Sequence, residues 1–232
     1  MRPVRRRHRR VAWTRRVVSC GIALGCLVLL AGEAGARDDW ELWTEFRWKK
    51  ALSERLALQG VSSGRLRGGM GELYQHFEEF GLGYQARPWV KLEGAYQWNQ
   101  IDRERTHDGL YEHRLYLAAT PSAALGRVRL ENRHRMELRR LNGAEGWRYR
   151  TRLKAGLRAG EGRWWRMRPY VSDELFYGFR AGEFLRNRAQ IGVERPLTAR
   201  VGVDVFYLVE SNRAGRDWAE RHGLGLAATL TF

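Results

Sequence analysis

Two neighbouring segments of the chain, 127–139 and 147–158, carry its densest pattern of ionisable residues. In each segment nearly every second residue is Arg, Lys or Glu, and Arg outnumbers Glu. On one face of adjacent strands, such side chains form cross-strand ion pairs and create an electric field. They would either interlock and rigidify a closed interior or line a pore whose surplus of Arg favours anions. The residues that we expect to line this interior are Arg129, Glu131, Arg133, Arg135, Glu137, Arg148, Arg150, Arg152, Lys154, Glu174 and Arg188.

Asp173 and Glu174 are adjacent carboxylates within a predicted strand. Since neighbouring residues of a strand face opposite sides, Asp173 would face outward unless a bulge or a rim position breaks the alternation, and we expect such a break. Arg186 and Arg188 follow after a short loop, so Glu174 is predicted to pair with an Arg rather than to act as a catalytic acid. Paired carboxylates alone are a weak signal of glycoside chemistry.

Serine and histidine offer a second chemistry, that of a lipid-modifying enzyme. No histidine forms the compact His-x-Ser arrangement of outer-membrane lipases and deacylases. A catalytic pairing of Ser62 or Ser63 with His107, in the predicted outer loops, remains an alternative. His76 and Glu78 share a face without an obvious third metal ligand. We therefore expect no catalytic residues, no metal, no cofactor and no enzymatic activity.

Part of the net charge of +16 lies at the N-terminus. Residues 1–36 hold eight Arg and one Glu, so the remainder carries 34 basic and 25 acidic residues, a net charge of +9. These remaining charges are spread through alternating segments instead of forming one basic patch. The distribution argues against a nucleic-acid partner.

The N-terminal segment has the order of a secretory signal peptide. A basic stretch, 1–16, precedes an apolar run, 17–31, and then Ala34-Gly35-Ala36. The apolar run is shorter than the roughly 20 residues of a membrane-spanning helix. We expect cleavage after Ala36, which leaves a single barrel domain over 37–232. The only two cysteines, Cys20 and Cys26, would be removed with the signal peptide.

The rest of the chain alternates with a period of two, in segments about as long as tilted membrane strands, ~9–11 residues. A soluble sandwich alternates as well, but it turns its charged face outward, whereas a membrane barrel encloses charge and exposes apolar residues to lipid. The export signal, tryptophans near segment ends and a final strand ending in Phe232 favour the barrel. Phe232 resembles the signal read by the barrel assembly machinery. The candidate strands are 40–48, 53–61, 72–85, 89–99, 110–119, 127–139, 147–158, 167–178, 185–194, 200–210 and 221–232.

These segments predict an all-β, antiparallel transmembrane barrel of about 10–12 strands. Because bacterial single-chain barrels have even strand numbers, we expect ten or twelve rather than the eleven segments found. Short periplasmic turns are expected at 49–52, 86–88, 121–126, 160–162 and 195–199, and outer loops at 62–71, 100–109 and 211–217.

Several segments together resemble a family of uncharacterised outer-membrane proteins, a domain of unknown function among membrane β-barrels. The segments are Trp40-Glu41-Leu42-Trp43, the strand Glu131–Glu137, Arg148–Leu153, Asp173–Phe176, and Asn187-Arg188 leading to Ile191–Val193. The resemblance implies a barrel and no established activity.

The expected location is the outer membrane of a Gram-negative bacterium. The expected partners are outer-membrane lipid, lipopolysaccharide and the assembly machinery. Three functions remain open: a small passive pore, a non-conducting structural or binding barrel, and a lipid-modifying enzyme.

Overall fold

A computed structural model of the chain describes residues 40–102, 109–158, 166–215 and 217–232. The expected signal peptide, His107, Trp164, Trp165 and the expected turn at 160–162 lie outside these residues. The described part consists of strands: β1 (Trp40–Ala51), β2 (Leu56–Arg67), β3 (Glu72–Arg87), β4 (Val90–Asp102), β5 (Gly109–Leu125), β6 (Val128–Leu141), β7 (Ala144–Leu157), β8 (Arg168–Gly178), β9 (Glu183–Pro196), β10 (Val201–Ala214) and β11 (Asp217–Thr231).

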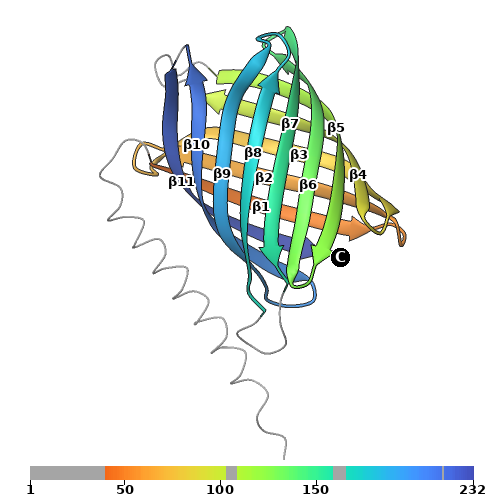
Figure 1. Ribbon diagram of the computed structural model, residues 1–232. Coiled ribbons are helices and arrows are strands. Elements are labelled where there is room, and N and C mark those ends of the chain that lie inside the picture. The colour runs from red at the N-terminus through yellow and green to blue at the C-terminus, as the bar shows by residue number, and fades with distance from the viewer. Residues whose placement is uncertain (1–39, 103–108, 159–165, 216) are drawn as a thin grey trace, which may run out of the picture.

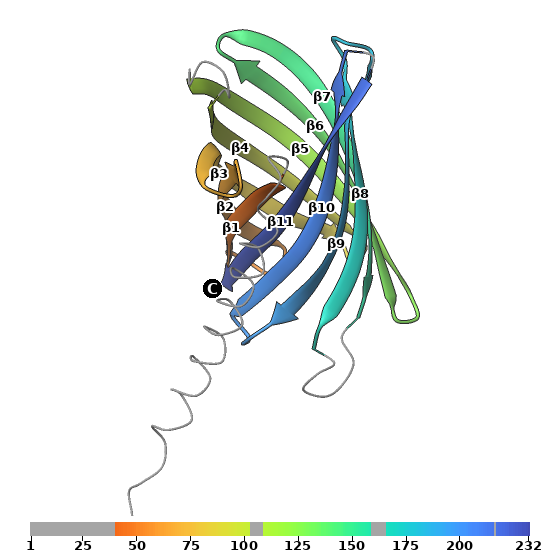
Figure 2. The ribbon, with the colours of Figure 1, turned by 90° about the vertical axis from the view of Figure 1, so that its left-hand side faces the viewer.

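The strands form one closed barrel in which each strand pairs with its neighbour in the sequence. Figures 1 and 2 show the strongly tilted strands wrapping around a common interior. All consecutive pairs are antiparallel, and β1 closes the barrel against β11 in a parallel pairing, from Trp40 opposite His222 to Lys49 opposite Thr231. No helix among the described residues is long and apolar enough to cross a membrane.

The strand count corrects one prediction. All eleven candidate segments are strands, whereas the expected even number of ten or twelve is wrong. Sequential antiparallel strands alternate in direction, so with eleven of them the first and last run the same way and close the barrel only in parallel. Odd-numbered barrels of this type are known outside bacterial single-chain proteins.

Several strands extend beyond their predicted ends. The expected outer loop 62–71 is mostly strand, because β2 runs to Arg67, and the expected loop 211–217 shrinks in the same way between β10 and β11. The expected turn 121–126 lies largely within β5, which ends at Leu125. Arg65, Arg67 and Ser122 in these stretches face a polar interior, so their polarity does not mark a loop. Between β6 and β7, Asn142 and Gly143 adopt positive φ values of 45° and 88°, as a tight hairpin turn requires.

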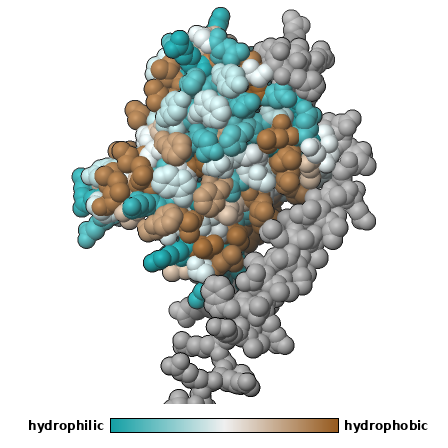
Figure 3. All heavy atoms as spheres, turned by 180° about the vertical axis from the view of Figure 1, so that it is seen from behind, coloured by the Kyte–Doolittle hydropathy of each residue, from teal (hydrophilic) through white to brown (hydrophobic). Residues whose placement is uncertain are grey.

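The barrel is inside out with respect to a soluble protein. Large apolar side chains on the outer wall are exposed, among them Leu117 at 72% and Ile191 at 58%. Apolar side chains occupy much of the outer surface in Figure 3. Glu112, Glu137 and Asn99 in the interior are fully buried. The predicted enclosure of charge is therefore confirmed. The two-residue period separates the charged face of each strand from its apolar face, and the closed barrel turns the charged face inward.

Only some of the tryptophans that were expected near segment ends lie there. Trp40, Trp147 and Trp218 lie at or near strand ends and Trp89 lies in the β3–β4 turn, while Trp48 and Trp98 lie several residues inside their strands. The C-terminal Phe232 is exposed, and its amide donates to the Lys49 carbonyl at 2.9 Å across the parallel seam.

Candidate functional site

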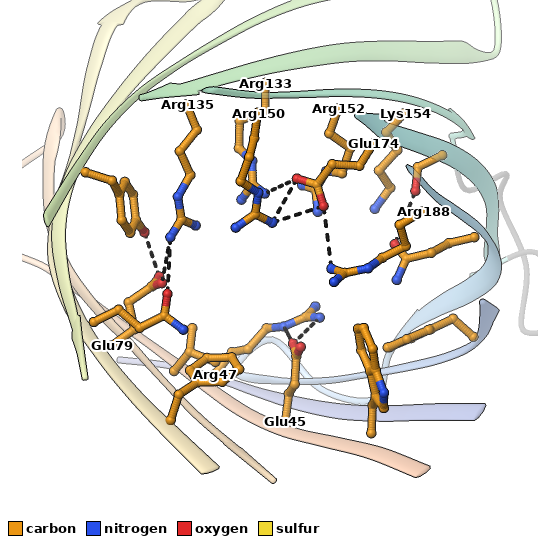
Figure 4. A pocket seen from close by; sticks show the side chains of 18 of the residues that line it. Glu45, Arg47, Glu79, Arg133, Arg135, Arg150, Arg152, Lys154, Glu174 and Arg188 are labelled. Atoms are coloured by element: carbon orange, nitrogen blue, oxygen red, sulfur yellow. Dashed lines mark hydrogen bonds and ion pairs between the residues drawn. The ribbon is translucent and has the colours of Figure 1, made fainter. Parts of the chain in front are cut away.

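The interior holds a polar cavity of about 1060 Å³. Its lining includes residues near both ends of the strands, such as Arg67 and Arg186 toward one end and Lys49 and Ser122 toward the other. Seventeen lining residues are Arg or Lys and nine are Asp or Glu, so the wall carries a formal excess of positive charge. Figure 4 shows side chains from opposite walls projecting into this space.

Glu137 on β6 is the most enclosed carboxylate among the predicted lumen residues. It receives Arg135 at 2.8 Å, Arg148 at 2.5 Å and Arg150 at 2.9 Å, and none of its side chain is exposed. Alternation places Arg135 and Glu137 on one face of β6, and the register sets Glu137 opposite Arg148. A buried carboxylate without a positively charged partner would be strongly unfavourable. Three guanidinium groups compensate the charge of Glu137.

Glu174 on β8 gathers a second group of arginines. Its oxygens lie 2.9 Å from Arg133, 3.0 Å from Arg150 and 3.5 Å from Arg188 (Figure 4). Arg188 also pairs with Glu210 at 2.5 Å, so ionic contacts continue from β6 to β10 along the wall. The sequence predicted that Glu174 pairs with arginine, and these distances confirm it.

The predicted lumen residues all face the interior. Ten of them line the cavity, and Glu137 is buried behind it. Arg129 pairs with Glu131 at 2.8 Å and is more than half exposed, and Lys154 pairs with Glu194. Arg152 is half-buried and makes no hydrogen bond or ion pair with another described residue.

Other interior residues were missed by sequence reasoning. Glu112 is fully buried between Arg114 and Arg139. The alternation in 110–119 carries this signal, since Glu112 and Arg114 occupy one face of that segment. Trp43 is also buried, with Arg65 stacked 3.6 Å from its ring centre and Arg188 at 4.5 Å. Tryptophans were expected near strand ends, but Trp43 shares the strand parity of Glu41 and Glu45, and this alternation is the signal that could have placed it inside.

The orientation of Asp173 contradicts a further prediction. The expected break in alternation is absent at this point: Asp173 faces outward, exposed, while Glu174 faces inward. The bulge lies later in the strand, between Phe176 and Tyr177. Asn187 on β9 donates a hydrogen bond to the Asp173 carboxylate at 2.8 Å, which supplies the outward charge with a polar partner.

Of the residues considered for catalysis or metal binding, Ser62, Ser63, His76 and Glu78 lie in the described part of the barrel, and His107 lies outside it. Ser62 donates to Glu78 at 2.6 Å, and Glu78 lies 3.1 Å from His76. Ser63 faces the interior and is buried, on the opposite side of β2 from Ser62. No group of three potential metal ligands occurs among the described residues.

A family model described as "Protein of unknown function (DUF2490)" matches residues 40–220. The chain belongs to this family. The match runs from β1 into β11, so DUF2490 covers nearly the whole barrel, as the resemblance in the sequence predicted.

Two solved barrels are similar to this DUF2490 chain. LpxR from Salmonella typhimurium is 9% identical, with 76% of this chain and 83% of that chain covered and a TM-score of 0.47. A loop L8 deletion mutant of OmpT, an outer membrane protein of Vibrio cholerae, is 10% identical, with coverage of 79% and 95% and a TM-score of 0.38. No curated protein matches the chain.

Proposed function

We propose that the chain is an outer-membrane β-barrel of a Gram-negative bacterium that acts as a small passive pore favouring anions and catalyses no reaction. The observation that carries this proposal is the excess of Arg and Lys over Asp and Glu along a cavity whose lining reaches toward both ends of the strands. A ring of fixed positive charge lowers the energy of an anion in a narrow passage and raises that of a cation.

The outer wall supports the membrane location. Apolar side chains such as Phe80, Leu115 and Val171 are more than half exposed, and burying them in hydrocarbon is favourable at about 25 cal/mol per Å². In this location the wall would contact lipid and lipopolysaccharide, and Phe232 would be read by the assembly machinery. Membrane fractionation, followed by electrophoresis with and without heating, tests this part. Recovery of a folded, water-soluble protein would contradict it.

A second candidate, a non-conducting barrel, is favoured by contacts that reach beyond adjacent strands. Arg135 on β6 lies 3.6 Å from Glu79 on β3, and Tyr116 on β5 donates to the same carboxylate group at 2.6 Å. If such contacts hold the interior closed, the ionic groups stabilise the fold and the outer surface binds a partner. A lipid-modifying activity remains the third candidate, with Ser62, Ser63 and His107 as the residues to test.

Planar-bilayer recording separates the first two candidates. Under a KCl gradient, we expect steady currents whose reversal potential indicates a preference for chloride. Arg129→Glu should shift that potential toward potassium, because Arg129 lines the cavity and is largely exposed. Arg140→Glu is the matched control, since it makes the same charge change on an exposed side chain of the same strand outside the cavity lining. Absence of current at every voltage, or an initial preference for potassium, would overturn the pore proposal.

A further inference from the structure

The interior contains three pairs of arginines that lie directly opposite each other on neighbouring strands. Like charges in directly opposed positions of a sheet destabilise it. Each pair therefore requires negative charge close by. The pairs are Arg114 with Arg139 between β5 and β6, and Arg135 with Arg150 and Arg133 with Arg152 between β6 and β7.

In the first of these pairs, one carboxylate bonds to both arginines. Glu112 accepts from Arg114 at 2.5 Å with one oxygen and from Arg139 with the other. The carboxylate is fully buried, so it acts as an internal counter-ion for both guanidinium groups.

The pair of Arg135 and Arg150 follows the same rule. A single oxygen of Glu137 lies 2.8 Å from Arg135 and 2.9 Å from Arg150. Two of the three opposed pairs thus have a bridging carboxylate supplied by the chain itself.

The pair of Arg133 and Arg152 has no such bridge among the described residues. Glu174 lies opposite Arg152 in the register and bonds to Arg133 at 2.9 Å, but it makes no ion pair with Arg152. Its oxygens are engaged by Arg150 and Arg188 as well. Both members of the unbridged pair line the cavity, where a solute would reach them (Figure 4).

We propose that Arg133 and Arg152 bind the carboxylate or phosphate group of a small solute. The bound group would take the place, between two guanidinium groups, that Glu112 and Glu137 occupy in the other pairs. Guanidinium groups match such oxyanions well because their planar N–H groups bond to two oxygens at once. The proposal concerns binding alone, so it holds whether or not the barrel conducts ions.

The site also makes an unusual prediction for the unliganded protein. Arg152 lies opposite the positive charge of Arg133 and makes no hydrogen bond or ion pair with another described residue, so Arg152→Gln should fold at least as stably as the wild type in the absence of oxyanions. Arg114→Gln should lower stability, because it removes one of the two partners of buried Glu112. A purely structural arginine at position 152 would not produce this contrast.

The experiment measures the thermal unfolding midpoint of the detergent-solubilised full barrel in inorganic phosphate, acetate or chloride at equal ionic strength. A solute that binds the folded state alone raises the midpoint, because it stabilises that state by RT ln(1 + L/Kd), where L is the free solute concentration. For wild type we expect a rise in phosphate, acetate or both relative to chloride, and the stronger of the two identifies the preferred group. Arg152→Gln should weaken the apparent affinity by about tenfold or more, as loss of a charge-assisted bond does.

Two controls locate the effect. Arg114→Gln and the exposed Arg129→Gln should both retain the oxyanion-dependent rise. The proposal is overturned if neither phosphate nor acetate exceeds chloride in the wild type, or if the rise persists in Arg152→Gln. Failure of Arg152→Gln to fold would also overturn it, because that outcome would mean that the arginine has an essential internal role.

Discussion

Replacement of Glu137 by Gln tests whether the ionic groups of the interior hold the barrel together. Glu137 is fully buried and receives Arg135, Arg148 and Arg150 within 3 Å. Glutamine has nearly the same shape but no charge, and its amide N–H groups repel the guanidinium groups that they face. Removing one partner from a buried ion pair costs about 3–5 kcal/mol, so the ratio of folded to unfolded protein should fall by roughly two to four powers of ten.

Glu131→Gln provides the matched comparison. Glu131 is on the same face of β6, but its side chain is 31% exposed and pairs with Arg129, which is 58% exposed. Such a pair contributes about 0–1 kcal/mol, and salt screens it. The free energy of unfolding, from reversible urea titration in lipid vesicles, should therefore fall several times more for Glu137→Gln. Equal losses in the two variants would refute the reasoning that burial makes this carboxylate indispensable.

One double substitution tests the outer wall, and one single substitution with its control tests the packing of the interior. Asp173→Val removes an outward charge, and Asn187→Val removes the amide that would otherwise lose its partner. Together they should raise the unfolding free energy in lipid vesicles by about 1 kcal/mol. A loss of stability would show that this polar pair is structural. Gly225→Ala should lower the unfolding free energy by about 1–3 kcal/mol, since the added methyl carbon would lie 2.1 Å from the buried Phe206 ring. Gly202→Ala, with its nearest neighbour at 3.8 Å, should change it little, and equal effects of the two alanines would contradict the packing argument.

Much of the architecture was predictable because strand formation and facing are local properties. A residue's face follows from its parity along the strand, so the inward set from Arg129 to Glu137 could be read directly from the alternation. The same rule applies to Asp173, where the predicted exception to alternation was wrong. The break in alternation was expected because an outward carboxylate without a polar partner is unfavourable. Asn187 supplies that partner, and it is adjacent to Asp173 only across the sheet.

The sequence by itself determined the strands, their order and the separation of a charged face from an apolar face, because a two-residue period and short connections are properties of consecutive residues. Only the tertiary structure decided the strand count at closure, the parallel seam of β1 and β11, and which arginines lie opposite which carboxylates. Register depends on how all eleven strands close together, and no single segment contains that information. For this reason Arg133 and Arg152 look like any other inward arginines in the sequence. Only the closed barrel shows that no carboxylate among the described residues bonds to both of them.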